Sequence, residues 1–276
     1  MTVLRVLPIC LSPGEGEAFA SWVDRAAADL ALPLSTLLVA MGLAEERPGE
    51  VISMPRAYGV TLTASELAAV CATTGCPPER IASTLLAHYG GRVFDLADVD
   101  LATGRGFSHL AVRHWVYASG SSFCSDCLVE SGGVWRLAWK LPWSFACTRH
   151  ARLLGGLCPA CGQRPRDKRR TKLGPQLPAS VPTPTSCSTS LRQSPVRDGR
   201  TFARCGFQLG GIELPSLANF QRLLSSQTEI DAVMAGRQPT VAGLPVSPLA
   251  FFGDLRALVY LMLQVGRVEV SPPVEY

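Results

Sequence analysis

Two short motifs decide the fold: Cys124-Ser125-Asp126-Cys127, and Cys147-Thr148-Arg149-His150 after nineteen further residues. In each motif two residues separate two ligand-type side chains, so one tight turn can direct both at a single metal ion. The residues between the motifs are enough for a hairpin that returns the second pair to the first. We therefore predict a structural zinc site on Cys124, Cys127, Cys147 and His150.

A second motif with the same spacing follows at Cys158-Pro159-Ala160-Cys161-Gly162. Cys187 and Cys205 are the cysteines that remain downstream of it, and together with Cys158 and Cys161 they would complete a four-cysteine site. The alternative is a half-site in which Cys187 is free. Two structural Zn²⁺ ions per chain are the prediction.

Hydrophobic side chains alternate between the two halves of the first site, at Trp135, Leu137, Trp139, Leu141 and Trp143. Alternation predicts strand residues or the core of a small domain. The sharper alternative is that the tryptophans are stacking platforms for bases.

Zinc catalysis is not expected, because a catalytic zinc keeps an open position beside three protein ligands and each site here has four. The chain has no deaminase motif, phosphate-binding Gly-rich loop, nucleophile elbow or acidic cluster suited to two-metal nuclease chemistry. Asp126 and Glu130 are expected to cap a turn, and His109 and His114 to serve packing or capping. We predict a protein that is not an enzyme.

Charge is distributed unevenly along the 276 residues. Residues 131–212 contain fourteen Lys and Arg against two Asp and Glu, whereas residues 1–130 have a net charge of −6 and residues 213–276 a net charge of −2. Basic side chains cluster directly after the second motif, in a run that suits the phosphate backbone of nucleic acid, with a solvated linker as the alternative. The run comprises Arg164, Arg166, Lys168, Arg169, Arg170 and Lys172.

Helices are predicted on both sides of the cysteine-rich segment. Ser12 to Glu15 and Thr63 to Glu66 have capping-box spacing, and each opens a predicted helical pair. Such pairs are compatible with helix-turn-helix DNA reading, but the second helix of each carries few basic residues, so helical-hairpin packing or protein binding is the alternative. Towards the C-terminus, Leu217, Phe220, Leu223 and Leu224 form one apolar stripe, and a longer helix is predicted from Ser247-Pro248.

The predicted fold is mainly α with small zinc-stabilised α+β modules. Residues 1–118 form a helical region with helix-turn-helix units, residues 119–211 a double zinc region of knuckles or ribbons with a basic Pro-rich loop, and residues 212–276 a helical part. The N-terminus lacks a signal peptide, and the longest apolar stretches, Leu30 to Ala44 and Ala257 to Val265, are too short to span a bilayer. A cytoplasmic protein is expected.

The order of these motifs resembles the TniQ family of transposition proteins. The likeness rests on three groups of residues: Leu7-Pro8-Ile9 with Gly16 to Arg25; the first site with Trp135-Arg136-Leu137 and Leu153-Leu154; and Leu157 to Gly162 with Arg204 to Leu209. The resemblance implies an N-terminal helix-turn-helix region, two zinc sites on the eight ligands named above, and a role in choosing where a transposon inserts.

Two hypotheses of function follow. In the first, implied by the resemblance, a non-catalytic adaptor of a mobile element serves DNA recombination by linking target DNA or an RNA-guided effector complex to an AAA+ transposition ATPase. It would act at the nucleoid, alone or with a second copy of the chain, and away from any membrane. In the second, a zinc-containing transcription regulator reads DNA through its helix-turn-helix units. The weakly basic second helices argue against the latter.

Overall fold

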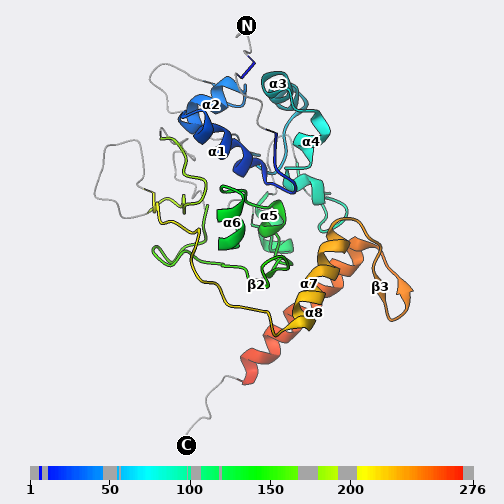
Figure 1. The fold of residues 1–276 in the computed structure, drawn as a ribbon. Coiled ribbons are helices and arrows are strands. Elements are labelled where there is room, and N and C mark those ends of the chain that lie inside the picture. The colour runs from blue at the N-terminus through cyan, green and yellow to red at the C-terminus, as the bar shows by residue number, and fades with distance from the viewer. Residues whose placement is uncertain are drawn as a thin grey trace, which may run out of the picture.

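The computed structural model describes residues 6–7, 12–45, 55, 57–97, 99–100, 107–117, 120–166, 180–191 and 204–269. Helices dominate these residues, and the two sheets are small antiparallel pairs, β1–β2 and β3–β4 (Figure 1). This confirms the mainly helical class. The helices are α1 (Phe19–Asp29), α2 (Leu34–Ala40), α3 (Ala64–Thr74), α4 (Pro78–Ala82), α5 (Phe107–His114), α6 (Ser125–Glu130), α7 (Gln221–Met234) and α8 (Pro248–Glu269), with 3₁₀ turns η1 (Leu86–Tyr89) and η2 (Leu137–Lys140); the strands are β1 (Ala146–Cys147), β2 (Arg152–Leu153), β3 (Thr240–Val241) and β4 (Leu244–Pro245).

The first helical pair, α1 and α2, packs around Phe19, Trp22 and Leu37, all of them buried. The predicted start of α1 at Ser12 is wrong, since the helix begins at Phe19. The cause is a turn over residues 14–17, in which the Gly14 N–H donates to Glu17 Oε2 at 2.8 Å. The Glu17 carboxylate therefore closes a turn that precedes α1. Residues 12–15 do not form the predicted capping box of this helix.

The second pair, α3 and α4, confirms the capping box at its start. Thr63 Oγ1 accepts from the Glu66 N–H at 3.2 Å, and Glu66 Oε2 accepts from the Thr63 N–H at 2.7 Å. The second half of this pair is divided into two elements, α4 and η1. The Leu86 N–H donates to the Gly59 carbonyl, so the backbone there pairs with a loop and the helix cannot continue.

The tryptophan segment of the middle region is a buried 3₁₀ turn and not a strand. Its five alternating hydrophobic residues are all less than 7% exposed, Trp135, Leu137, Trp139, Leu141 and Trp143. Trp135 Nε1–H also donates to the Pro184 carbonyl at 2.7 Å. These side chains form core, as one of the two predicted readings had it, and they offer no open ring face for bases.

Backbone pairing attaches α1 to this middle region. Glu17 forms an antiparallel bridge with Arg136, the Ala18 N–H donates to the Trp135 carbonyl at 2.9 Å, and the Leu137 N–H donates to the Gly16 carbonyl at 2.7 Å. Ser21 Oγ accepts from the Trp135 N–H at 2.9 Å and donates to Glu17. These hydrogen bonds cross the boundary predicted at residue 118 and attach α1 to the middle region.

A buried ion pair completes that attachment. Arg166 and Asp24 are both less than 5% exposed, and the guanidinium donates to the Asp24 carboxylate and to the Ala20 carbonyl. The guanidinium also lies over the Trp135 ring, 5.1 Å from its centroid. Arg166 lies in the turn that follows Cys161, and it therefore links this turn to α1.

The C-terminal helices pack back on the middle region through α7. Gln227, fully buried, accepts from the Phe145 and Ala146 N–H groups at 2.8 and 3.0 Å and donates to the Trp143 carbonyl. The start of α8 at Pro248 agrees with the prediction. The predicted apolar stripe is only partly right: Leu217 is buried, but Phe220 is 56% and Leu223 is 42% exposed.

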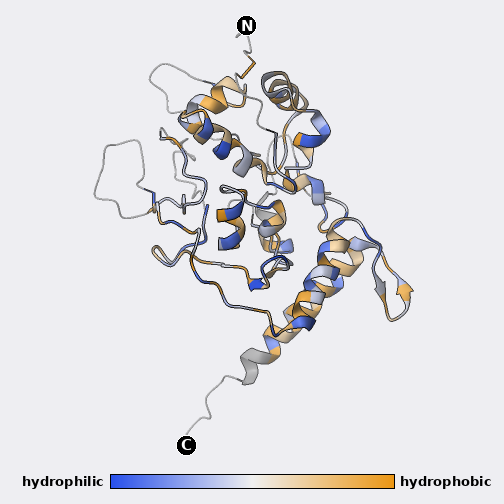
Figure 2. Cartoon of the chain, viewed as in Figure 1, coloured by the Kyte–Doolittle hydropathy of each residue, from blue (hydrophilic) through white to orange (hydrophobic). Residues whose placement is uncertain are grey.

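The distal half of α8 extends beyond α7 and is rich in exposed apolar residues (Figure 2). By length and composition alone, Pro248–Val265 is apolar enough to cross a membrane, although the stretch Ala257 to Val265 is too short by itself. One such helix is weak evidence of a membrane segment. Exposed apolar surface of this extent is typical of a surface that contacts a partner.

We predict that Arg166→Ala destabilises the protein by about 3–5 kcal/mol, because it leaves the Asp24 carboxylate buried without its partner. The matched control is Arg237→Ala, which removes an exposed pair with Glu229 and should cost less than about 1 kcal/mol. Urea unfolding at fixed metal concentration measures both. Equal effects of the two substitutions would show that the buried pair does not hold α1.

Candidate metal centres

The first donor cluster is built by a helix start and a hairpin turn. Cys124 is the N-cap of α6, and Cys127 lies in its first turn. Cys147 ends β1, and His150 lies in the turn that leads to β2, where Ala151 takes a φ of +47°. The helix start and the hairpin turn thus each contribute two donors.

The separations in this cluster suit a tetrahedral ion. Cys127 Sγ and Cys147 Sγ are 3.6 Å apart, and His150 Nδ1 lies 3.3–3.5 Å from the sulfurs of Cys124, Cys127 and Cys147. Zn–S bonds of about 2.3 Å and Zn–N bonds of about 2.0 Å in a tetrahedron require S···S and S···N separations of about 3.8 and 3.5 Å. A disulfide would bring two sulfurs to about 2.05 Å, so these are thiol donors.

The second cluster is closed by Cys187 and Cys205, as the sequence predicts. The Cys158 and Cys205 sulfurs are 3.7 Å apart, those of Cys161 and Cys187 are 3.8 Å apart, and all four lie within 4.8 Å of one another. The Cys187 N–H donates to the Phe207 carbonyl, which aligns the two distal segments. Cys187 is therefore not isolated, and the half-site alternative loses its basis.

Glycines let the backbone turn sharply after two of these cysteines. Gly162 follows Cys161 with a φ of +63°, and Gly206 follows Cys205 with a φ of +68°. The Gly162 N–H donates to the Cys158 carbonyl at 2.9 Å. A side chain at either glycine would be strained in this left-handed conformation, so both turns depend on glycine.

The electrostatics of both clusters favour a bound cation. Hydrogen bonds with Cys124 and Cys147, together with burial, raise the pKa of Cys127, while hydrogen bonds with Cys124 and Cys127 lower the pKa of Cys147. In the second cluster burial raises the pKa of Cys187 to about 12. The thiols of Cys127 and Cys187 therefore hold protons that a divalent ion would displace. The positive charge of that ion would also offset the repulsion between neighbouring thiolates. Both donor sets fit a divalent metal ion with soft-ligand preference.

Glu130 orients the histidine of the first cluster. Its Oε1 lies 3.0 Å from His150 Nε2, and its Oε2 lies 2.8 Å from Arg149. A neutral imidazole that donates from Nε2 presents the lone pair of Nδ1 to the centre of the cluster, where a metal ion would lie. The predicted turn-capping role of Glu130 missed this contact. Its position three residues after Cys127, one helical turn along α6, is the signal that could have revealed it.

The predicted nucleic-acid residues fall into two groups. Arg164 stacks on the Tyr117 ring at 3.7 Å and donates to Ser122 Oγ, and Arg166 is buried with Asp24. The prediction that Arg166 contacts a phosphate is therefore corrected, since the α1 interface encloses its guanidinium. The remaining four, Lys168, Arg169, Arg170 and Lys172, lie outside the described residues.

The fold and the clusters define a mainly helical protein with two metal-binding-competent sets of donors. The family model described as TniQ matches residues 8–154, so the chain belongs to the TniQ family, which serves target selection in transposition without catalysis. The match includes the whole first cluster and ends just before the second. A search of the curated proteins found no match.

We predict two zinc ions per chain, measured by mass spectrometry of metal in purified protein. Cys127→Ser and Cys187→Ser should each reduce the content to about one, because each removes a ligand from one cluster. Cys71→Ser is the control, since this thiol lies in α3 and outside both clusters. A content of one zinc ion per wild-type chain would show that the second cluster does not bind zinc.

We also predict that Glu130→Gln weakens metal binding at the first cluster by about tenfold, the lower end for loss of a carboxylate that orients a ligand histidine. The rate of zinc transfer to a chromogenic chelator measures this loss of affinity. The kinetic phase that Cys127→Ser abolishes is assigned to the first cluster. Glu229→Gln, an exposed acid on α7, should change neither phase. If both clusters responded equally to Glu130→Gln, the carboxylate would act only through overall charge.

Proposed function

We propose that this protein is a non-catalytic adaptor that selects transposition targets, linking target DNA or an RNA-guided effector complex to an AAA+ transposition regulator. Membership of the TniQ family supports the general role. The observation that carries the proposal is the pair of four-donor clusters, which lie within a basic middle segment between two helical ends. It would work in the cytoplasm, at the nucleoid.

A structural role for two Zn²⁺ ions is part of this proposal. Each cluster supplies four protein donors, which fills a tetrahedral ion and leaves no position for a reacting water. Binding free energy at such sites is folding free energy, about 10–16 kcal/mol in small zinc-finger peptides. The ions would thus fix the shape of the middle region.

The basic run is the proposed nucleic-acid contact. Its start is fixed: Arg164 is stacked on Tyr117, Arg166 is paired with Asp24, and the Ser121 N–H donates to the Pro165 carbonyl between them. Four further cations follow within six residues of Arg166. Such a group attracts phosphates without reading bases.

The helical ends are the proposed protein contacts. Both ends have net negative charge, which makes them poor surfaces for DNA. Among the described residues the longest run of exposed apolar side chains is on α8, where Leu258, Leu261 and Met262 are each more than half exposed. Apolar helix faces of this kind suit a groove or helix on a partner.

The alternative, a transcription regulator that reads DNA with its helical pairs, has less support. Helix α2 has no basic residue, and Leu34, Leu37 and Leu38 are buried within the chain. Helix α4 has five residues, and its Arg80 donates to the Pro13 carbonyl at 2.7 Å. Neither helix offers a basic face for a major groove.

We predict that replacing Lys168, Arg169, Arg170 and Lys172 together with Gln weakens duplex DNA binding for all sequences alike. Each lost phosphate contact should flatten the log–log salt dependence by about 0.9. Fluorescence anisotropy over a range of salt concentrations measures the slope. Arg222→Gln with Arg237→Gln, both on or near α7, removes two positive charges outside the run and serves as the comparison per charge removed. An unchanged slope in the fourfold variant would identify the run as a solvated linker.

A second prediction concerns the regulator. Leu258→Glu with Met262→Glu, one helical turn apart on α8, should weaken binding of the cognate AAA+ ATPase at least tenfold in a pull-down with the full chain. The control is Val112→Glu, which alters an exposed valine on α5. Light scattering must accompany the assay. A variant that changed only the number of copies per particle, and not ATPase capture, would refute the docking role of α8.

A further inference from the structure

The two donor clusters differ in how well their cysteines are covered. All three cysteines of the first cluster are buried, and the most exposed of them is 8% exposed. In the second cluster Cys158 and Cys187 are buried, whereas Cys161 and Cys205 are partly exposed. A small solute therefore has better access to the cysteines of the second cluster.

The glycines that follow the two partly exposed cysteines leave open space beside them. Apart from chain neighbours, a methyl group at Gly162 or at Gly206 would meet no atom within 4 Å. At Gly155, which pairs with Phe123 next to the first cluster, a methyl carbon would lie 2.5 Å from the Phe123 ring. The surroundings of the first cluster are thus closely packed, and those of the second are open.

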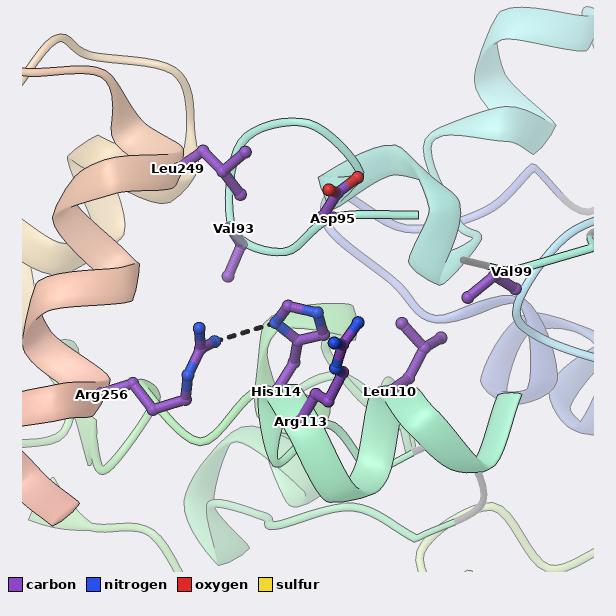
Figure 3. A pocket seen from close by; sticks show the side chains of 8 residues that line it. All are labelled: Val93, Asp95, Val99, Leu110, Arg113, His114, Leu249 and Arg256. Atoms are coloured by element: carbon purple, nitrogen blue, oxygen red, sulfur yellow. Dashed lines mark hydrogen bonds between the residues drawn. The ribbon is translucent and has the colours of Figure 1, made fainter. Parts of the chain in front are cut away.

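Two cavities in the described part of the chain offer no better route to a cluster thiol. The one of about 580 Å³ between η1, η2 and α7 has Cys147 in its lining, but this cysteine is only 8% exposed. The one of about 390 Å³ lies between α5, α8 and the turn after η1, and no residue of its lining contains sulfur (Figure 3). Cys161 and Cys205 remain the accessible cysteines of the clusters.

Each partly exposed cysteine also has a buried cysteine close to it. The sulfurs of Cys205 and Cys158 are 3.7 Å apart, and those of Cys161 and Cys187 are 3.8 Å apart. A disulfide holds its sulfurs at about 2.05 Å, so either pair has to close by less than about 2 Å. Accessible thiols with a second thiol beside them are the ones that oxidants convert to disulfides.

We propose that the second cluster is a modification site for hydroperoxides, where Cys161 or Cys205 is oxidised and then joined to its buried neighbour. With hydrogen peroxide, the thiolate of Cys205 attacks one oxygen: an S–O bond forms, the O–O bond breaks, and the leaving hydroxide takes a proton from solvent. The thiolate of Cys158 then attacks the sulfenic sulfur, so an S–S bond forms, the S–O bond breaks, and a second hydroxide leaves as water. Two electrons pass from the two thiolates to the peroxide.

The disulfide removes two of the four donors, so the oxidised cluster can no longer hold a metal ion tightly. Its effect would extend to the turn after Cys161. The Cys205 N–H donates to the Thr189 carbonyl at 3.0 Å, and Thr189 Oγ1 donates to the Arg164 carbonyl at 2.9 Å. Oxidation would therefore loosen the support of the turn that carries Arg164 and Arg166. This reactivity does not depend on the adaptor role.

Stepwise oxidation of the full, zinc-loaded chain tests the site. Hydrogen peroxide is added, catalase stops the reaction, and a chromogenic chelator measures the zinc released. Free thiols are then alkylated, and peptide mass mapping locates the disulfides. The first zinc equivalent should leave together with a disulfide between Cys158 and Cys205 or between Cys161 and Cys187, at least tenfold faster than the second equivalent. Dithiothreitol with added zinc should reverse both changes.

Two controls separate oxidation from weak binding. The chelator without peroxide should release zinc from the second cluster at least tenfold more slowly. Cys71→Ser, which removes a partly exposed thiol outside both clusters, should behave as the wild type does. A first disulfide within the first cluster, zinc release without a disulfide in the second cluster, or equally fast release without peroxide would overturn the assignment.

Discussion

Confinement of four donor atoms within 4.8 Å, at two places in one chain, is the constraint on which the rest of the structure depends. Between residues 120 and 211 the described chain forms one short helix, one 3₁₀ turn and two two-residue strands. None of these elements is long enough to be stable alone. The cysteines are themselves part of the hydrophobic core there, packed with Phe123, Trp135, Trp139 and Leu209. Metal bonds at the two clusters would take the place of the regular hydrogen-bond ladders that a larger domain uses.

The same constraint extends to the N-terminal helices. Trp135 lies between the two halves of the first donor set, and its backbone and ring contact α1 through Ala18, Ser21 and the Asp24–Arg166 pair. Arg166 lies five residues after Cys161 of the second cluster. A residue close in sequence to the ligands of each cluster therefore contacts α1. A change of metal content would therefore reach α1 through these contacts as well as the middle region.

The sequence alone predicts features whose partners are close in the chain. The Cys-x-x-Cys and Cys-x-x-His motifs, the Thr63 capping box and the start of α8 are of this kind, and the structure places them as expected. Cys187 and Cys205 were also predictable, because few cysteines remained to complete the second set. Features set by contacts between residues far apart in the sequence could not be predicted in this way. Arg166 reads as part of a basic run, yet its partner Asp24 is 142 residues away. The Gly59 carbonyl, which accepts from the Leu86 N–H and divides α4 from η1, acts in the same way.

Hydrogen exchange of the protein with and without metal tests the central claim most directly. The account predicts that removal of metal by a strong chelator abolishes protection of the backbone amides in residues 123–154 and also in α1. Helix α3, which packs against α4 and does not contact the clusters, should retain more protection and serves as the internal reference. Persistence of full protection in α1 and in residues 123–154 after complete metal removal would contradict the account.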